Sequence, residues 1–131
     1  MNVSGADIKG VELGAQRDLD FLPGFLRHFG IVANATLYYE TRRWGARLSE
    51  AYRGTYLDSI GSGGNIGEGY KATNNVDFAS HYNITPTLKV TAEAINLTNQ
   101  HIVQFTDLAA QRIEVNTSSG RTFLLGVTAE F

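Results

Sequence analysis

The sequence predicts an all-β protein, built as an antiparallel meander of about six strands. Apolar and polar residues alternate with a period of two over six segments, which places them on opposite faces of half-buried strands. The composition agrees, since 14 Gly stand beside only 2 Pro, and 6 Tyr and 7 Phe supply residues that strands favour. Short turns and long connections separate the segments alternately. A chain of 131 residues is enough for one domain.

The first two strands are expected over residues 8–17 and 30–40. In the first, Val11, Leu13 and Ala15 fall on one face, with Glu12 and other polar residues on the opposite one. The second shows the same alternation without interruption.

The third strand is expected over residues 44–56, and it forms a hairpin with the second through a turn at 41–43. Its alternation places Tyr56 on the apolar face, together with Trp44. Arg53 falls on the opposite, polar face. A hairpin of this kind fixes two neighbouring strands as antiparallel.

The last three strands are expected over residues 76–84, 88–94 and 120–131. A tight turn at 85–87, which contains Pro86, joins the first two of them. The final strand carries five alternating apolar residues: Phe123, Leu125, Val127, Ala129 and Phe131. It is about as long as a tilted strand that crosses a bilayer, namely about 9 to 11 residues.

The connections alternate in length in a manner typical of outer-membrane barrels. Residues 18–29, 58–74 and 98–118 form long connections, whereas the two hairpin turns are short. Polar faces rich in Arg, Glu, Asp, Asn and Thr suit a water-filled barrel interior. Alternation alone fits a soluble β-sandwich or small-barrel ligand-binding module equally well, because it does not distinguish lipid from a partner sheet.

Composition argues against several classes of partner. The formal net charge of −2 gives no basic surface for nucleic acid. The absence of Cys excludes thiolate metal sites and Cys nucleophiles. No window approaches the roughly 18 apolar residues of a membrane helix. The first residues, Met1 to Gly5, do not resemble an export signal.

A few residues could suggest chemistry, and none forms a specific motif. Asp77, His81 and Glu93 fall on polar faces of neighbouring strands, where polar residues of a barrel interior would also lie, and they lack the tight spacing of a zinc motif. His28 and His101 fall in expected loops. We therefore nominate no metal ligand.

The glycine-rich stretch 61–69 lacks the Gly-Lys-Ser/Thr ending of a phosphate-binding loop. Ser49 and Ser80 are not part of a Gly-x-Ser-x-Gly turn. We therefore expect no enzyme, no catalytic residue and no cofactor.

Several phrases, in order, resemble the C-terminal barrel of TonB-dependent outer-membrane receptors of the siderophore-receptor type. They cover almost all of the chain: Ile8-Lys9-Gly10-Val11-Glu12-Leu13, Phe21-Leu22-Pro23-Gly24, Leu37-Tyr38-Tyr39-Glu40, Gly45-Ala46-Arg47-Leu48-Ser49 with Tyr52-Arg53, Ala94-Ile95-Asn96-Leu97-Thr98-Asn99, and Gly120-Arg121-Thr122-Phe123 running to Phe131.

The resemblance implies that residues 1–131 are a C-terminal segment of a transmembrane β-barrel in the outer membrane of a Gram-negative bacterium. The plug and most of the barrel of such a receptor would lie outside this segment. The implied partners are outer-membrane lipid, a ferric siderophore or similar small ligand through the whole receptor, TonB through the absent N-terminal part, and the barrel-assembly machinery through Phe131. Loops 58–74 and 98–118 are the expected ligand-contacting regions, with no single residue nominated. A non-functional receptor fragment is the other alternative.

The chain departs from the family pattern in its second strand. In the family the 21–24 phrase is a periplasmic turn, and a long external loop separates two strands that are fused here at Ala35-Thr36-Leu37. Either residues 18–29 move to the external side, which gives six strands of alternating direction, or residues 30–40 fold back without spanning. We favour six strands. Glu50 is a second departure from the family pattern, because alternation places this charged residue on the face that is expected to contact lipid.

Overall fold

The computed structural model describes residues 8–15, 32–60, 67–107 and 109–130. These residues form ten β-strands, and no helix occurs among them. The strands are β1 (Ile8–Gly14), β2 (Val32–Glu40), β3 (Trp44–Arg53), β4 (Tyr56–Ile60), β5 (Gly67–Tyr70), β6 (Thr73–Thr85), β7 (Leu88–Ile95), β8 (His101–Thr106), β9 (Arg112–Ser118) and β10 (Thr122–Ala129).

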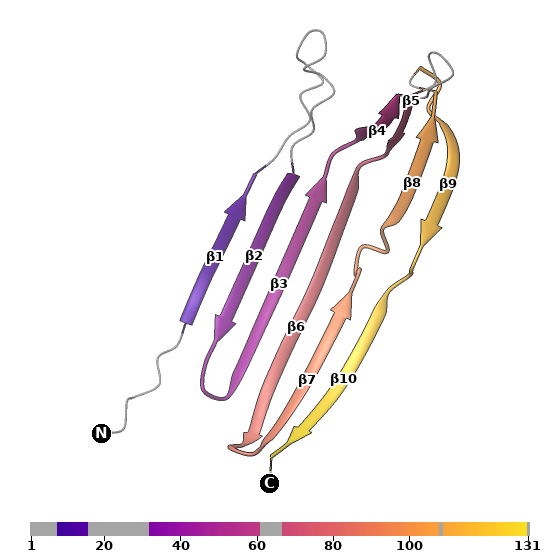
Figure 1. Cartoon of the computed structure of the whole chain (residues 1–131). Helices are drawn as coiled ribbons and strands as arrows, with labels where there is room; N and C mark the ends of the chain where they lie inside the picture. Colours follow the sequence, from indigo (N-terminus) through magenta and orange to yellow (C-terminus); the bar gives the residue numbers. More distant parts are fainter. Residues whose placement is uncertain (1–7, 16–31, 61–66, 108, 131) are drawn as a thin grey trace.

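The strands form two antiparallel sheets. The large sheet has six strands in the order β1-β2-β3-β6-β7-β10, and the small sheet has four in the order β4-β5-β8-β9. Figure 1 shows that each strand of the small sheet continues the path of a strand of the large sheet, so that β4 follows β3 and β8 follows β7. The large sheet is therefore the predicted six-stranded meander, which confirms the all-β antiparallel class.

The large sheet is open rather than closed into a barrel. Its edges are β1 and β10, and no described residue pairs one edge with the other. An open edge presents a row of backbone N–H and C=O groups that have no ladder partner.

The fused strand is a single continuous element. β2 pairs with β1 from Glu40 to Asn34, and with β3 over its whole length from Val32 to Glu40. It begins at the end of the sheet where β3 ends, because Val32 lies opposite Arg53. The expected number of six strands is thus confirmed for this sheet, with successive strands alternating in direction.

Two of the expected long loops are largely hairpins, which corrects the prediction. The 58–74 segment contains the end of β4, all of β5 and the start of β6. The 98–118 segment contains β8 and β9. These strands were missed because they are short, and because two of the ladders shift register, between Leu57 and Ser59 and between Gln104 and Phe105, which breaks the alternation.

Register places the side chains of the large sheet on two faces of different character. Residues directly opposite one another across a ladder share a face. One such row crosses all six strands and is apolar throughout: Val11, Leu37, Leu48, Phe78, Ala94 and Phe123. We call this side of the large sheet the apolar face. The neighbouring row carries Tyr38, Arg47, Ala79 and Glu93, and we call that side the polar face.

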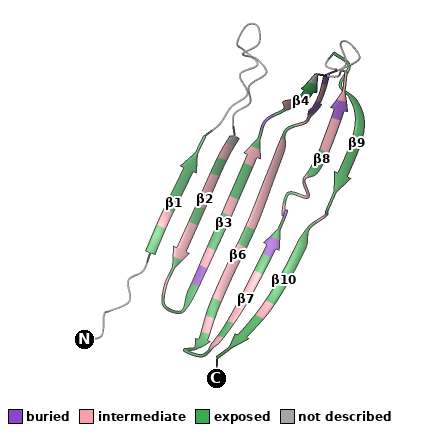
Figure 2. Ribbon diagram, viewed as in Figure 1, coloured by how far each residue is buried: buried purple, intermediate pink, exposed green. Residues whose placement is uncertain are grey.

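The described residues contain almost no hydrophobic core. The buried apolar side chains among them are Ala94 in the large sheet and Phe105 in the small sheet. Figure 2 shows the strands of the large sheet mostly exposed or half-buried along their length. Leu13 is 81% exposed and Leu125 is 86% exposed, although both belong to the apolar face.

Some expectations fall on residues outside those that the structure describes. These are connection 18–29 with its phrase 21–24 and His28, residues 61–66 of the glycine-rich stretch, and Phe131. Within that stretch Gly67 and Gly69 lie in β5 rather than in a loop.

Candidate functional site

The polar face of the large sheet is hollowed near its hairpin turns. A hollow of about 550 Å³ is lined there by Tyr38, Arg47, Glu93 and other polar residues. A Cβ atom added at Gly10 would collide with the ring of Tyr38 from the neighbouring strand. The glycine therefore provides the room in which this large side chain lies across the sheet.

The three polar residues singled out in the sequence do not converge. Asp77 accepts a hydrogen bond from the backbone N–H of Asn96 at 2.8 Å. His81 Nε2 lies 3.2 Å from an oxygen of Glu40, and Glu93 lies opposite Ala79 in the next ladder. Among the described residues no group of three or more His, Cys, Asp or Glu side chains is placed to hold a metal ion.

The other nominated side chains have structural contacts. His101 lies in β8 rather than in a loop, which corrects the prediction, and its Nδ1 is 3.1 Å from Oδ1 of Asn116. Ser80 Oγ donates to the carbonyl of Ala92 at 3.4 Å. Ser49 lies opposite Thr36 and Asp77 on the polar face. None of these contacts couples a nucleophile to a base.

Asn96 organises the junction between the two sheets. It is 5% exposed and has a φ of 57°, a left-handed conformation that Asn adopts more readily than most residues. Its Oδ1 accepts from the backbone N–H of Gln100 at 2.6 Å, and its Nδ2 donates to the carbonyl of Gly120 at 2.9 Å. Since Gly120 precedes β10, the side chain ties the β7–β8 connection to the neighbouring strand.

Three further hydrogen bonds close this junction. The backbone N–H of Asn74 donates to Oε1 of Gln100 at 2.7 Å, and Oγ1 of Thr98 donates to the carbonyl of Asn74 at the same distance. Arg121 Nε donates to the carbonyl of Leu97 at 2.9 Å. Residues 96–99 are therefore a structural joint, because the side chains of Asn96 and Thr98 satisfy backbone groups where the ladder is interrupted.

Beside this joint lies a hollow of about 750 Å³, which we call the junction hollow. Arg53 contributes a guanidinium whose carbon lies 3.6 Å from the ring centre of Tyr56. Tyr56 in turn stacks on Tyr70, with ring centres 5.1 Å apart and an interplanar angle of 19°. Ile102 from β8 also lines the hollow.

The prediction that Arg53 and Tyr56 lie on opposite faces is wrong. β3 ends at Arg53, and two residues, Gly54 and Thr55, separate it from β4. Because the strand is interrupted, the alternation of faces does not continue from Arg53 to Tyr56. The ring of Tyr56 therefore lies beneath the Arg53 guanidinium. A glycine at the end of an alternating run was the only sequence signal for this break.

Aromatic side chains gather at the hairpin end of the apolar face. Tyr39 and Trp44 have ring centres 4.6 Å apart, and Tyr82 lies opposite Trp44 in the next ladder. Lys9 Nζ lies 5.0 Å from the ring centre of Tyr39. This end therefore combines large rings with a cation.

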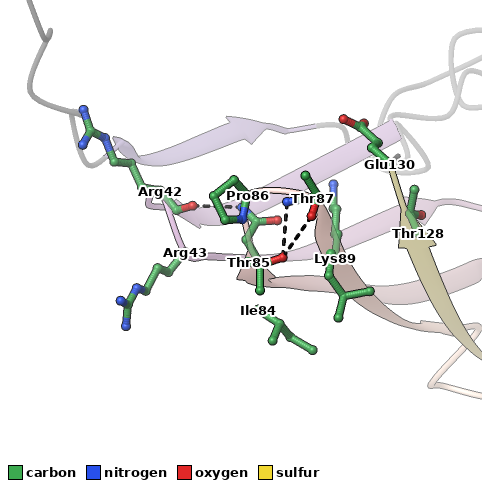
Figure 3. Close-up of a pocket in the computed structure, with 11 residues that line it drawn as sticks. Arg42, Arg43, Ile84, Thr85, Pro86, Thr87, Lys89, Thr128 and Glu130 are labelled. Carbon is green, nitrogen blue, oxygen red and sulfur yellow. Dashed lines mark hydrogen bonds between the residues drawn. The ribbon is translucent and has the colours of Figure 1, made fainter.

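Around the two hairpin turns the side chains do not form a binding site. Figure 3 shows the hollow of about 530 Å³ that the turns enclose, with the Arg42 and Arg43 side chains directed away from each other and from Pro86. Its hydrogen bonds include one between β6 and the 41–43 turn, in which Asn83 Nδ2 donates to the Arg42 carbonyl at 2.9 Å, and one within the 85–87 turn, in which the Thr87 N–H donates to Oγ1 of Thr85 at 3.3 Å.

Comparison of the chain with family models, with curated proteins and with solved structures gave no match. Within the part of the chain that the structure describes, there is no helix of the length and hydropathy needed to cross a membrane.

Proposed function

We propose that the large sheet is a section of the wall of an outer-membrane β-barrel of the TonB-dependent receptor type. Its apolar face would contact lipid, and its polar face would line the water-filled interior. The observation that carries this proposal is the apolar row across all six strands, with the charged and polar side chains of the central strands on the opposite face, together with the exposure of the apolar side. Alternation of this kind is what a lipid-facing strand requires.

The cost of exposing the apolar face to water supports lipid as its solvent. Five side chains at the two edges are more than 60% exposed, and each would gain about 1.5–3 kcal/mol on leaving water. The total is on the order of 10 kcal/mol, which is comparable to the whole stability of a typical domain. The five are Val11, Leu13, Phe123, Leu125 and Val127.

The aromatic cluster at the hairpin end fits a membrane interface. Tyr and Trp concentrate at the boundaries of the apolar band in outer-membrane barrels. Trp44 and Tyr52 both lie on the apolar face of β3, eight residues apart, or about 26 Å along the strand. With a strand tilt of roughly 40° this gives about 20 Å of height, close to the ~25 Å band of such barrels.

Further strands would complete the barrel at the edges of β1 and β10. Six strands are fewer than the eight of the smallest membrane barrels. On this proposal the small sheet extends the strands beyond the membrane on the side of the long connections. The whole receptor would take up a ferric siderophore or a similar small ligand, and the chain itself would catalyse no reaction.

The proposal is tested by folding the purified chain in water and in detergent micelles. We expect precipitation or association in water, and β-rich circular dichroism of a dispersed species only in micelles. A folded, water-soluble monomer would contradict the membrane-wall proposal, and it would favour a soluble ligand-binding module instead.

A further inference from the structure

We propose that the junction hollow binds a small organic anion that carries an aromatic ring. The inference rests on the proposed function, because the hollow would then be a ligand site of the receptor at the level where the strands leave the membrane. It assigns a ligand chemistry to particular residues, which the resemblance to receptors does not do.

The charge of the hollow points to an anion. Its lining includes the cations Arg53 and Lys71 and contains no Asp or Glu. The excess is local, since the chain as a whole has 11 Lys and Arg against 13 Asp and Glu. Among the described residues neither cation forms a salt bridge. Two unneutralised cations in one hollow favour a negatively charged ligand.

None of the described residues hydrogen-bonds the Arg53 guanidinium, and its edge is therefore available to that ligand. Its guanidinium lies 3.6 Å from the ring centre of Tyr56, a stacking contact that uses the face of the cation. The N–H donors of a guanidinium lie in its plane, where they match the two oxygens of a carboxylate. Stacking on Tyr56 thus orients the cation while leaving its donors available.

The apolar part of the lining points to a ring on the ligand. Tyr56 and Tyr70 are stacked with nearly parallel planes, and both line the hollow. Ile95 and Ile102 also line it, and they are 40% and 53% exposed. A flat apolar group would cover these side chains while its anionic group meets the cations. The volume of about 750 Å³ lies within the range of small-molecule sites.

The joint built on Asn96 fixes one wall of this site through hydrogen bonds. Asn96 and Gln100 both line the hollow and are hydrogen-bonded to each other and to neighbouring strands. A preformed site loses less conformational entropy when it binds a ligand.

The test uses the full chain refolded in micelles and 4-fluorobenzoate as the probe, with saturation-transfer 19F NMR as the readout. We expect saturable binding that benzoate displaces. Cyclohexanecarboxylate, with the charge but no aromatic ring, should compete more weakly, and benzylamine, with the ring but the opposite charge, should not compete. Equal competition by all three compounds would overturn the proposal.

Variants locate the binding. Arg53→Gln should weaken it about tenfold, which is the effect expected for a charge-assisted hydrogen bond. Lys71→Gln and Tyr70→Leu should each weaken binding as well. These two variants keep the test decisive if the Arg53 variant fails to fold. The control Arg47→Gln removes a cation from the same strand six residues away, about 20 Å along β3, and should leave binding unchanged.

The outcomes separate this inference from the proposed function. A chain that folds only in micelles and does not bind 4-fluorobenzoate would contradict the ligand site and leave the membrane wall standing. A chain that folds as a monomer in water and binds the probe through Arg53 would contradict the membrane wall, and the assignment of the hollow to an aromatic anion would stand.

Discussion

The two sheets have nearly the same strand directions and very different packing. The strands of the large sheet run for seven to thirteen residues, and one of its faces carries a row of apolar side chains that crosses all six strands. The strands of the small sheet run for four to seven residues, and two of its three ladders contain a register shift. Among the described residues, the small sheet buries the ring of Phe105 to 1% exposure, whereas the buried apolar side chain of the large sheet is the much smaller Ala94.

This difference indicates two kinds of environment. A sheet of long strands with an exposed apolar side requires something outside itself to cover that side. A sheet of short strands that buries its own aromatic residue is stabilised in part from within, and its residues Tyr56, Tyr70 and Ile102 line the junction hollow. We expect substitutions in the two sheets to have different effects.

The largest loss of stability is expected for Phe105→Ala. The ring packs on Gly69, where an added Cβ atom would lie 2.8 Å from it, and loss of a fully buried Phe costs about 3–5 kcal/mol. Hydrogen exchange in micelles should accelerate at amides of the small sheet and remain slow in the large sheet. Equal acceleration in both sheets would show that they unfold as one unit and break the comparison. Ile113→Ala, at an exposed position of β9, is the control.

The next effect is expected for Leu48→Arg, at the centre of the apolar face. A cation at mid-membrane on the lipid side costs about 2–4 kcal/mol, so the free energy of unfolding in micelles or vesicles should fall by that amount. Ser49→Arg places the same cation one residue away on the polar face, and it should cost less than about 1 kcal/mol. Similar losses in the two variants would argue against lipid contact.

At the joint between the two sheets, substitution of Asn96 is expected to lower the free energy of unfolding. Asn96→Ala loses the bonds to Gln100 and Gly120 and strains the left-handed backbone, and it should cost about 2–3 kcal/mol. Asn96→Gly loses the same bonds without that strain, and it should recover about 1 kcal/mol of the loss. Chemical denaturation in micelles measures both. If Ala and Gly were equivalent, the backbone conformation would not contribute.

The smallest effect is expected for Glu50→Leu. Glu50 lies opposite Ala35 and Val76 on the apolar face and is exposed there. Removing the charge should stabilise the chain in micelles by about 1 kcal/mol, since an acid near the edge of the membrane costs little. Glu12→Leu on the polar face is the matched control, and it should give no gain. A loss of stability in Glu50→Leu would place that position in water.

Much of the large sheet could be predicted from alternation alone. The rows through Leu48 and Arg47 follow directly from the period of two, and the turns at 41–43 and 85–87 lie where expected. The prediction failed at Gly54, because alternation cannot show where a strand is interrupted and restarts. It failed again at Gly67 and Gly69, since glycine has no side chain to alternate and β5 therefore gave no signal.

The candidate site depended on those interruptions. Arg53 and Tyr56 come together only because β3 ends between them, and Tyr70 joins them through the hairpin of β4 and β5. The 94–99 phrase contributed to the resemblance, and no structural role was predicted for Asn96; the structure places this residue at the joint. The sequence also does not show that this joint borders a hollow, because a hollow depends on contacts between residues far apart in the chain.

The central claim is that lipid covers the apolar face, and the single tryptophan tests it most directly. Trp44 lies on this face beside Tyr39, at its hairpin end. We would refold the chain in lipid vesicles and measure quenching of Trp44 by bromine placed near the head or near the tail of the acyl chains. The account predicts strong quenching, greatest for bromine near the head. Fluorescence that neither lipid quenches, from a chain that remains folded in the aqueous phase, would contradict it.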